Sequence, residues 1–344
     1  MKKALITGVT GQDGAYLAET LLENGYEVFG THRPTNNIVT WRLEQLGILN
    51  HPKFSLYASD QVDLSSCKTM IEKIAPDEIY NLSAQSSVAK SFKDVYATVM
   101  SSGLSALNLL EAIRVVNSSV RFFQASSADL FGKCVTSPQN EKTTFNPQSP
   151  YAVAKLFAHH CAVNYRECHG IYAASGILFN HDSPLRSKDF VTRKITNAVA
   201  KISLGYQDVL VLGNLDVTRD WGYAKDYVDG MYRMMQHDVP DTFILATNRT
   251  ASVRDFVDLA FKVVDINLLW EGSGINSCAF DRNSGRLMVR VDEQFYRPHE
   301  VGNLMGDATK ALNVLGWQAN IRIEQLCKIM VSEDLYRVEQ QLQF

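Results

Sequence analysis

The sequence predicts an α/β fold in which a doubly wound parallel sheet is followed by a smaller, mixed α/β lobe at the C-terminus. Short apolar runs of strand length alternate regularly with helical patterns from the N-terminus to residue 181. After residue 181 the alternation breaks down into mixed segments, without an internal repeat or a flexible linker. We therefore expect a first domain over residues 1–181, joined by some later strands and helices, and a second lobe formed mainly by residues 182–344.

Length and charge restrict the classes of partner. The chain has 344 residues, of which 46% are hydrophobic, and its formal net charge is −3. This charge gives no electrostatic reason to expect a nucleic acid or a membrane surface as partner, and no apolar run approaches membrane-spanning length. The six cysteines form no CxxC motif, and the His and Cys residues at 159–169 would point in several directions from a helix. We expect reduced thiols in a cytoplasmic protein and no metal site.

The first predicted strand, residues 3–7, runs into a glycine-rich turn that precedes a helix at 15–22. Glycines let the backbone turn sharply and approach a pyrophosphate at the N-terminus of that helix. The spacing is GxxGxxG rather than GxGxxG, but its place between a strand and a helix is typical of a Rossmann-type dinucleotide site. The residues expected at the cofactor are Gly8, Thr10, Gly11, Gln12, Asp13 and Gly14.

The second predicted strand, residues 27–31, is followed by an arginine where an NAD site would carry an acid for the ribose 2′-hydroxyl. Arg33 suits a 2′-phosphate, because a guanidinium can contact it in a bidentate manner. NADP is therefore the predicted cofactor. Arg42, directly after Trp41, is a second candidate for the same phosphate. Each arginine also fits an ordinary solvated surface position.

Further strands and a long helix continue the alternation. The strands are predicted at 54–58, 78–82, 121–125 and 172–178, and the helix at 96–116. The strand at 78–82 ends in small residues that allow a cofactor to approach closely, and the strand at 121–125 leads to Ser126, Ser127 and Asp129. Because the carboxyl ends of parallel strands meet at one edge, where such folds bind ligands, we expect a site at that edge.

Tyr151 and Lys155 are four residues apart in a predicted helix that begins near Ser149, so they lie on one face. A tyrosine normally titrates near ~10, and a lysine ammonium one turn away favours the phenolate and lowers that pKa. Such a pair can take a proton from a sugar hydroxyl while a hydride leaves the same carbon. The spacing equally fits an amphipathic helix with a snorkelling lysine, so the other motifs have to decide between the two.

The C-terminal region mixes both kinds of element. Helices are predicted at 191–204, 224–236, 253–264 and 323–339, and strands at 209–212, 243–245 and 288–291. The glycine-rich and serine-rich stretch 271–289 is predicted to be a loop.

Together these residues resemble the extended short-chain dehydrogenase/reductase family and, within it, the GDP-mannose 4,6-dehydratases. The resemblance runs nearly end to end. The motifs that carry it lie at 7–14, 81–86, 149–155, 178–181, 190–194, 212–214, 219–222 and 296–301. It implies a lyase that converts GDP-mannose or a GDP-manno-heptose to the GDP-4-keto-6-deoxy sugar with tightly bound NADP. It also implies a homodimer or homotetramer, with NADP in the first domain and the GDP-sugar mainly in the second.

The resemblance also implies site residues. Those at the cofactor would be Asp63, Leu64, Leu82, Ser83, Ala84, Gln85, Ser86, Tyr96, Lys155, His181 and Arg186. Those at the GDP-sugar would be Ser87, Asn180, Val191, Lys194, Gly213, Arg219, Arg297 and Glu300. The catalytic set would be Ser127, Asp129, Tyr151 and Lys155, with Ser127 orienting the C4 hydroxyl, Tyr151 removing its proton and Asp129 abstracting the C5 proton.

Three positions depart from the family pattern. Asp129 stands where the family usually has the longer glutamate, Ser87 where it often has histidine, and His32 where it usually has the first of two arginines. Two other functions therefore stay open: a C4 reductase or epimerase that never eliminates water, and a non-catalytic nucleotide-sugar binding protein. The intact Tyr151–Lys155 pair argues against the last of these.

Overall fold

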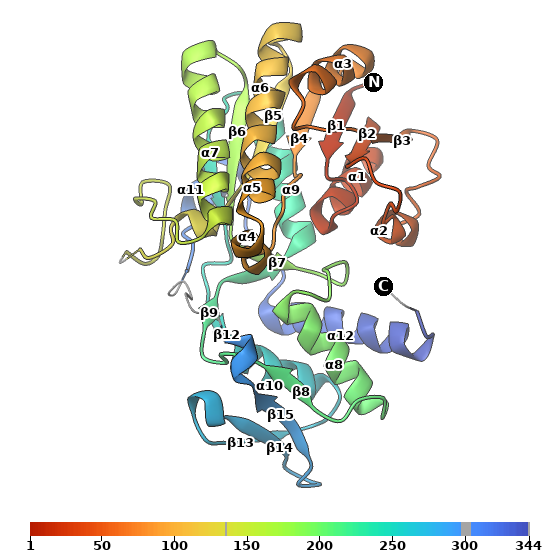
Figure 1. The fold of residues 1–344 in the computed structure, drawn as a ribbon, viewed down its shortest axis with the longest axis vertical. Coiled ribbons are helices and arrows are strands. Elements are labelled where there is room, and N and C mark those ends of the chain that lie inside the picture. Colours follow the sequence, from red (N-terminus) through yellow and green to blue (C-terminus); the bar gives the residue numbers. More distant parts are fainter. Residues whose placement is uncertain (135, 297–303, 343–344) are drawn as a thin grey trace.

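The computed structural model describes residues 1–134, 136–296 and 304–342 (Figure 1). A seven-stranded sheet runs through the upper part of the molecule in the order β11-β6-β5-β4-β1-β2-β3, and every neighbouring pair is parallel. Its strands are β1 (Lys3–Thr7), β2 (Glu27–His32), β3 (Phe54–Ala58), β4 (Glu78–Asn81), β5 (Arg121–Ser127), β6 (Ala173–Leu178) and β11 (Thr242–Leu245). The predicted fold class is confirmed. The edge strand β11 comes from the second half of the chain.

Helices cover both faces of this sheet and enclose two apolar cores. One face packs against α1 (Gln12–Glu23), α9 (Ala224–Gln236) and α11 (Thr309–Leu315). The other packs against α3 (Leu64–Ile74), α6 (Ser105–Val116) and α7 (Pro150–His169). Each helix buries one apolar stripe, which is the usual way in which a parallel sheet is covered on both faces.

The predicted helix at 96–116 is present but interrupted. It consists of α5 (Val95–Val99), a π-helical turn at Met100–Leu104 and α6. By length and composition alone, Val95–Val116 could cross a membrane, contrary to our expectation that no run reaches that length. Half of its most apolar window is buried inside the protein, as in a core helix.

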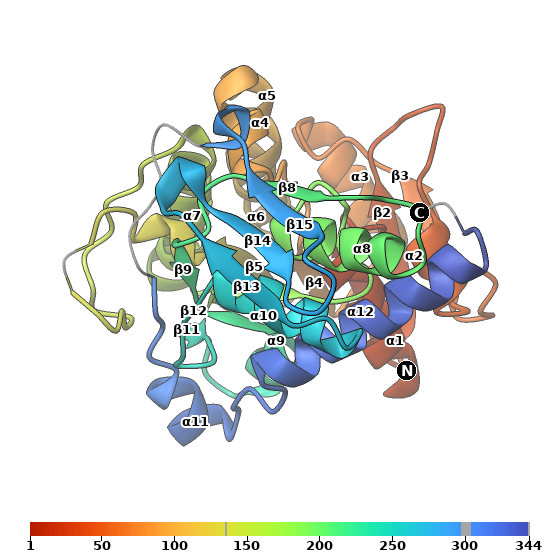
Figure 2. The ribbon, with the colours of Figure 1, turned by 90° about the horizontal axis from the view of Figure 1, so that it is seen from below.

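The smaller lobe contains a four-stranded sheet in the order β13-β14-β15-β8, formed by Leu268–Glu271, Cys278–Asp281, Leu287–Val291 and Leu210–Leu212 (Figure 2). Three helices pack on it: α8 (Val191–Ser203), α10 (Val253–Val263) and α12 (Ile323–Glu339). The predicted loop at 271–289 is wrong, because β14 and the start of β15 lie within it. Gly272, Gly274 and Gly285 take positive φ angles in the turns between these strands rather than forming one continuous loop.

Two short two-stranded ribbons connect the lobes. In one, β7 (Asn180–Asp182) pairs in parallel with β10 (Trp221–Tyr223). In the other, β9 (Thr218–Arg219) pairs antiparallel to β12 (Ala251–Ser252). The sequence patterns did not predict these strands. They matter because they carry Asn180, His181 and Arg219, which are predicted site residues.

Candidate active site

The glycine turn between β1 and α1 lies close to two neighbouring strands. Gly8 has a φ of +70°, and the N–H groups of Gly8 and Val9 donate to Thr31 O at 3.1 and 3.2 Å. A Cβ on Gly8 would lie 3.0 Å from Ser83 Cα, and one on Gly14 would lie 2.6 Å from Gly8 O. A larger residue at Gly8 would therefore clash with the backbone that follows β4, and one at Gly14 would clash with the glycine turn. In the described chain no side chain caps the α1 N-terminus, so its first N–H groups suit the diphosphate of a dinucleotide.

The sheet order reverses between β1 and β4, and the segment after β4 lies at that switch point. Thr7 Oγ1 donates to Asn81 Oδ1 at 2.8 Å and accepts from the N–H groups of Leu82 and Ser83, both at 3.2 Å. Ligands bind at such switch points in open α/β sheets. The structure therefore places the predicted cofactor segment, residues 82–86, beside the glycine turn.

Asp13 and His181, both predicted to contact the cofactor, bind each other. His181 Nε2 lies 2.9 Å from Asp13 Oδ2, and His181 Nδ1 lies 2.7 Å from Phe179 O. Burial opposes ionisation of Asp13, but the charge and hydrogen bond of His181 lower its pKa to about 2. Burial likewise opposes protonation of His181, but Asp13 raises its pKa above the usual value. The pair therefore favours the imidazolium–carboxylate state, and it ties α1 to β7.

Ser127, Asp129 and Tyr151 converge at the carboxyl end of β5. Ser127 is the last residue of β5, and its Oγ accepts from the N–H of Asp129 at 3.2 Å. Tyr151 lies in the first turn of α7, which Ser149 caps, and its side chain is almost fully buried. Burial raises the pKa of Tyr151, the charge of Asp129 raises it further, and a hydrogen bond with Ser127 opposes the rise. A phenol, a hydroxyl and an acid therefore share one site.

Lys155 is buried one turn along α7 from Tyr151, and its Nζ donates to Ala125 O at 2.8 Å. Burial lowers the pKa of Lys155 to about 8. Burial and the charge of Asp129 outweigh the favourable charges around the phenol, so the pKa of Tyr151 is raised overall, and the Lys155 ammonium donates to the backbone of β5. That Lys155 lowers the pKa of Tyr151 stays a prediction.

The two arginines predicted for a 2′-phosphate have different surroundings. Arg33 directly follows β2 and is exposed. Arg42 lies in α2 (Trp41–Gln45), where its Nε donates to Leu185 O at 2.6 Å and its Nη1 to Thr10 O at 3.0 Å. Arg42 thus supports the glycine turn, whereas Arg33 stays exposed at the end of β2.

Three other predicted cofactor positions differ in exposure. Asp63 caps α3, which begins at Leu64, by accepting from two backbone N–H groups. Tyr96 lies on α5 with 75% of its surface exposed. Arg186 follows β7, with its Nε 2.9 Å from Asp182 Oδ1 and its guanidinium 3.6 Å from the centre of the Phe190 ring.

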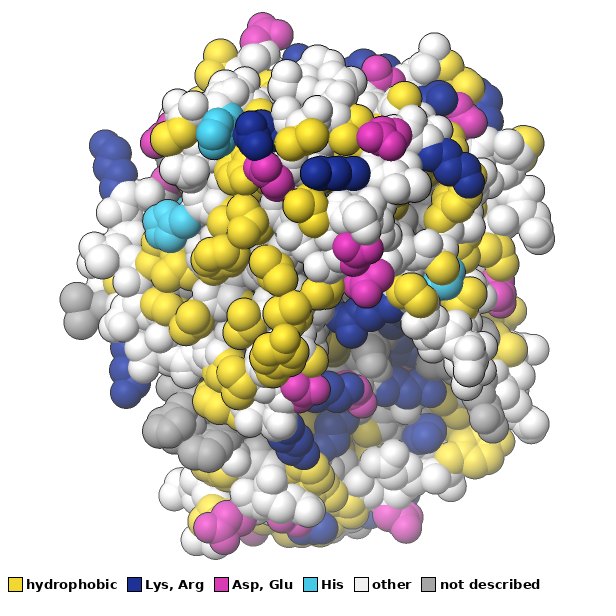
Figure 3. All heavy atoms as spheres, turned by 45° about the horizontal axis from the view of Figure 1, so that its top comes forward, with side chains coloured by type: hydrophobic (Ala, Val, Ile, Leu, Met, Phe, Trp, Pro, Cys, Tyr) yellow, Lys and Arg dark blue, Asp and Glu magenta, His cyan; other side chains and the backbone are white. Residues whose placement is uncertain are grey.

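Of the predicted GDP-sugar residues, those that the structure describes lie near the junction of the two lobes (Figure 1). Lys194 Nζ lies 3.8 Å from the centre of the Phe295 ring, and Gly213 packs against the backbone of Phe295. Val191 begins α8, Asn180 begins β7, Arg219 ends β9, and Ser87 caps α4 (Val88–Lys93). Figure 3 shows Lys and Arg side chains gathered in a hollow at this level of the molecule, which suits a diphosphate. The predicted residues Arg297 and Glu300 lie outside the described residues.

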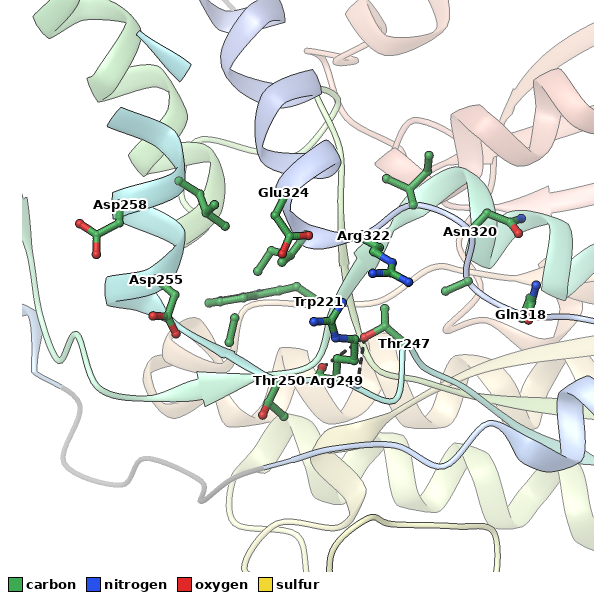
Figure 4. Close-up of a pocket in the computed structure, with 15 residues that line it drawn as sticks. Trp221, Thr247, Arg249, Thr250, Asp255, Asp258, Gln318, Asn320, Arg322 and Glu324 are labelled. Carbon is green, nitrogen blue, oxygen red and sulfur yellow. Dashed lines mark hydrogen bonds between the residues drawn. The ribbon is translucent and has the colours of Figure 1, made fainter. Parts of the chain in front are cut away.

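A separate cavity of about 640 Å³ lies between β12, the start of α10 and the start of α12 (Figure 4). Arg249, Asp255, Arg322 and Glu324 are among the side chains that line it. Its described lining residues include none of those predicted for catalysis, cofactor or substrate. The predicted site is instead the hollow at the carboxyl edge of the seven-stranded sheet.

A dinucleotide turn, a Tyr–Lys helix and an acid after β5 thus meet in one place, as the resemblance implied. The family model described as GDP-mannose 4,6 dehydratase matches residues 5–330. The chain belongs to the GDP-mannose 4,6-dehydratase family. Membership extends through both lobes, since the match runs from within β1 to the first half of α12.

Curated relatives agree with this family over almost the whole chain. A GDP-mannose 4,6-dehydratase of Sinorhizobium fredii is 49% identical over 339 residues, covering 97% of each protein. The Yersinia enterocolitica enzyme of the same name is 46% identical and covers 99% of this chain and 95% of its own. The human GDP-mannose 4,6 dehydratase is 44% identical, covering 96% and 91%.

Solved structures show that this fold carries more than one chemistry. A dTDP-glucose 4,6-dehydratase of Bacillus anthracis matches with a TM-score of 0.80 at 16% identity, covering 99% of this chain and 98% of its own. A UDP-glucose 4-epimerase of Thermotoga maritima also matches with a TM-score of 0.80, at 21% identity, covering 98% and 99%. At these identities the likeness shows the fold alone, so the side chains at the site have to separate elimination from epimerisation.

Sequence reasoning gave no role to several buried polar residues near the site. Arg193 sits inside the motif at 190–194 but was not assigned, and Asp334 and Arg337 in α12 were not considered. All three are buried, and both arginines form ion pairs with Asp334. Arg193 could have been noticed as a charged residue at a helix position that faces an apolar core. That position can be recognised only once the packing of α8 against α12 is known.

Proposed function

We propose that the protein is a GDP-sugar 4,6-dehydratase that acts on GDP-mannose or a GDP-manno-heptose and uses NADP as an internal hydride carrier. The observation that carries this proposal is the convergence of Ser127, Asp129 and Tyr151. A reductase or an epimerase needs only the phenol and the hydroxyl. Asp129, whose charge raises the pKa of Tyr151, supplies the additional base that elimination of water requires.

The residues would act in sequence on one sugar. Ser127 orients the C4 hydroxyl, and Tyr151 as phenolate takes its proton. Burial raises the pKa of Tyr151 overall, and the positive charge of Arg186 opposes that rise and so favours the phenolate. The chemistry supplied by a bound nicotinamide is acceptance of a hydride from C4 and its return at C6. Asp129 then removes the C5 proton, which the new 4-ketone acidifies, and passes it to the C6 hydroxyl, which leaves as water. A proton equivalent to the one taken by Tyr151 is added at C5 when the hydride returns to C6.

The preference for NADP over NAD is part of the same proposal. It is supported by the exposed Arg33 directly after β2, where an NAD site would place a carboxylate. The glycine turn, with no room for a Cβ at Gly8 or Gly14, supports a dinucleotide of either kind.

We also propose that the protein is cytoplasmic and forms a homodimer or homotetramer. The six cysteines are unpaired, as in a reducing compartment.

The proposed homo-oligomer is supported by exposed apolar side chains that form one surface over α4, α5 and α7, seen as a yellow band in Figure 3: Phe92, Val95, Tyr96, Val99, Val153 and Phe157. Such a patch suits a second copy of this chain. Phe157→Glu should lower the mass measured by light scattering, whereas Val314→Glu, an equally exposed site on α11, should not.

Incubation with each GDP-sugar tests the function. A dehydratase should convert the substrate to a product that is lighter by one water, without net consumption of NADPH or NADP. Stoichiometric consumption of NADPH with no loss of water would instead support the reductase. Absence of both turnover and isotope exchange would support the non-catalytic binding protein.

A further inference from the structure

Arg193 is a buried charge within the substrate helix α8. Its neighbours in the motif, Val191 and Lys194, are predicted to meet the GDP-sugar, whereas Arg193 itself is completely buried. Since successive residues in a helix are offset by about 100°, Arg193 points nearly opposite to Val191 and to a different side from Lys194. A buried guanidinium is tolerated only when it is paired and fully hydrogen-bonded, so its partners indicate what it holds in place.

The partners come from two other parts of the chain. Arg193 Nε lies 2.8 and 2.9 Å from the two carboxylate oxygens of Asp334 in α12, and Nη2 lies 2.8 Å from Oδ1. Arg193 Nη1 donates to Pro184 O at 2.7 Å and to Arg186 O at 2.8 Å. One side chain therefore joins α8 and α12 to the segment that follows β7.

That segment, residues 183–186, is fixed by arginines from three separate elements. Arg337 of α12 donates to Pro184 O at 2.6 Å, and Arg42 of α2 donates to Leu185 O at 2.6 Å. With Arg193, the carbonyl oxygens of residues 184, 185 and 186 all accept from guanidinium groups. Burial, and then the charges of Arg193 and Arg186, lower the pKa of Arg42 to about 10, which shows how closely these cations gather.

The side chain that emerges from this segment is Arg186. It is partly exposed, whereas Arg193 and Arg337 are buried, and it is held between Asp182 and the Phe190 ring. The carboxylates that face the cluster include Asp182, Asp334 and Glu333, and Asp13 also interacts with Arg42 and Arg186. Arg193 therefore fixes the backbone of Arg186, because it donates to the carbonyl oxygens of Pro184 and Arg186.

We propose that Arg193, braced by Asp334, is a positioning residue for the cofactor: it holds the 183–186 segment so that Arg186 meets NADP, and it links that contact to the substrate helix α8. The inference rests on the proposed function in one respect, namely that Arg186 contacts the cofactor. Arg193 touches neither ligand. Its effect passes entirely through Arg186.

The test is NADPH binding by calorimetry, without sugar and without turnover. Arg193→Lys keeps the charge but cannot reach the carboxylate and two carbonyls at once, and it should raise the Kd about tenfold. Met330→Ala, a fully buried position on α12 that is apolar, is the matched control for lost stability. It should lower the Tm while leaving the Kd within twofold.

A double variant separates positioning from a direct contact. If Arg193 acts through Arg186, adding Arg193→Lys to Arg186→Ala should weaken binding no further. Should Arg193→Lys fail to fold, Asp334→Asn carries the same test and should raise the Kd in the same direction. An unchanged Kd in a folded variant, or additive effects with Arg186→Ala, would overturn the inference. Dehydration by the wild type is measured in a separate assay. If the wild type does not dehydrate any GDP-sugar, the proposed function is rejected, but the NADPH-binding result for Arg193 still stands.

Discussion

His181 Nε2 lies 2.9 Å from Asp13 Oδ2, across 168 positions of the sequence. The contact joins the first turn of α1 to β7, and the His181 ring also stacks on Tyr227 with 4.5 Å between ring centres. Asp13 and His181, both predicted to contact the cofactor, thus also bind each other. The dinucleotide turn is braced from the strand that leads to the 183–186 segment.

Removing this pair should cost stability in a pH-dependent way. His181→Asn should lower the free energy of unfolding by about 1.5–3 kcal/mol, the range for a hydrogen bond to a charged group. Because the pKa of Asp13 is lowered from 3.8 to about 2, its contribution is present above 3.8 and lost as pH falls through 2. Because the pKa of His181 is raised above 6.5, its contribution is present below 6.5 and lost as pH rises through the raised value.

Urea denaturation between pH 3 and 9 measures this effect. The difference between wild type and His181→Asn should be greatest from about pH 4 to 6.5. In the Asp13→Asn background the histidine substitution should cost much less, as a double-mutant cycle would show. A pH-independent difference, or additive effects, would contradict the ion pair.

Arg33→Ala should reduce the preference for NADP over NAD. Loss of a charge-assisted contact of about 1.5–3 kcal/mol corresponds to roughly a 10- to 150-fold weaker binding of NADP, with NAD little changed. Titration of both cofactors measures the ratio. Arg282→Ala, at an exposed arginine of the smaller lobe, serves as control. Equal affinity of the wild type for NAD and NADP would show that the cofactor assignment is incorrect.

Lys194→Met should raise KM for the GDP-sugar more than it lowers kcat. Lys194 is expected to contact the diphosphate, which is remote from the reacting carbons, so its loss removes binding that is uniform along the reaction. Initial rates with varied GDP-sugar test this. Lys201→Met, near the other end of α8, should leave KM unchanged. A fall in kcat at constant KM would place Lys194 at the chemistry instead.

The strands of the main sheet could be predicted because each is a short segment rich in apolar residues between polar or turn-forming stretches. The edge strand β11 and the end of β5 at Ser127 were close to their predicted positions. The region 271–289 failed, because β14 has only four residues and its flanking glycines resemble a loop. Short strands in a small, partly exposed sheet carry too few apolar positions for periodicity to identify them.

The sequence predicted which residues belong to the candidate site, but it did not predict the contacts between them. A motif indicates that Tyr151 and Lys155 share a helix face, yet it cannot show that Lys155 donates to Ala125 O. Likewise, no spacing rule connects Arg193 to Asp334, which lies 141 residues away. Contacts of this kind depend on how α7, α8 and α12 pack, and packing is decided by the whole fold.

The shorter acid at position 129 is the point on which dehydration depends. An aspartate carboxylate lies about 1–1.5 Å nearer the backbone than that of glutamate, and a misplacement of ~1 Å can cost ~100-fold in rate. The charge of Asp129 nevertheless raises the pKa of Tyr151, so the carboxylate still lies near the phenol. We expect the pocket to have compensated, since Ala128 and Ser87 are also small.

The decisive measurement is exchange of the C5 hydrogen of GDP-mannose and GDP-manno-heptose with solvent deuterium, followed by mass spectrometry. Wild type should incorporate deuterium at C5 and release water from at least one of them. Asp129→Asn should abolish both while still producing bound NADPH absorbance from C4 oxidation. If wild type oxidises C4 but never exchanges the C5 hydrogen of either sugar, the dehydratase function is contradicted and the reductase or epimerase takes its place.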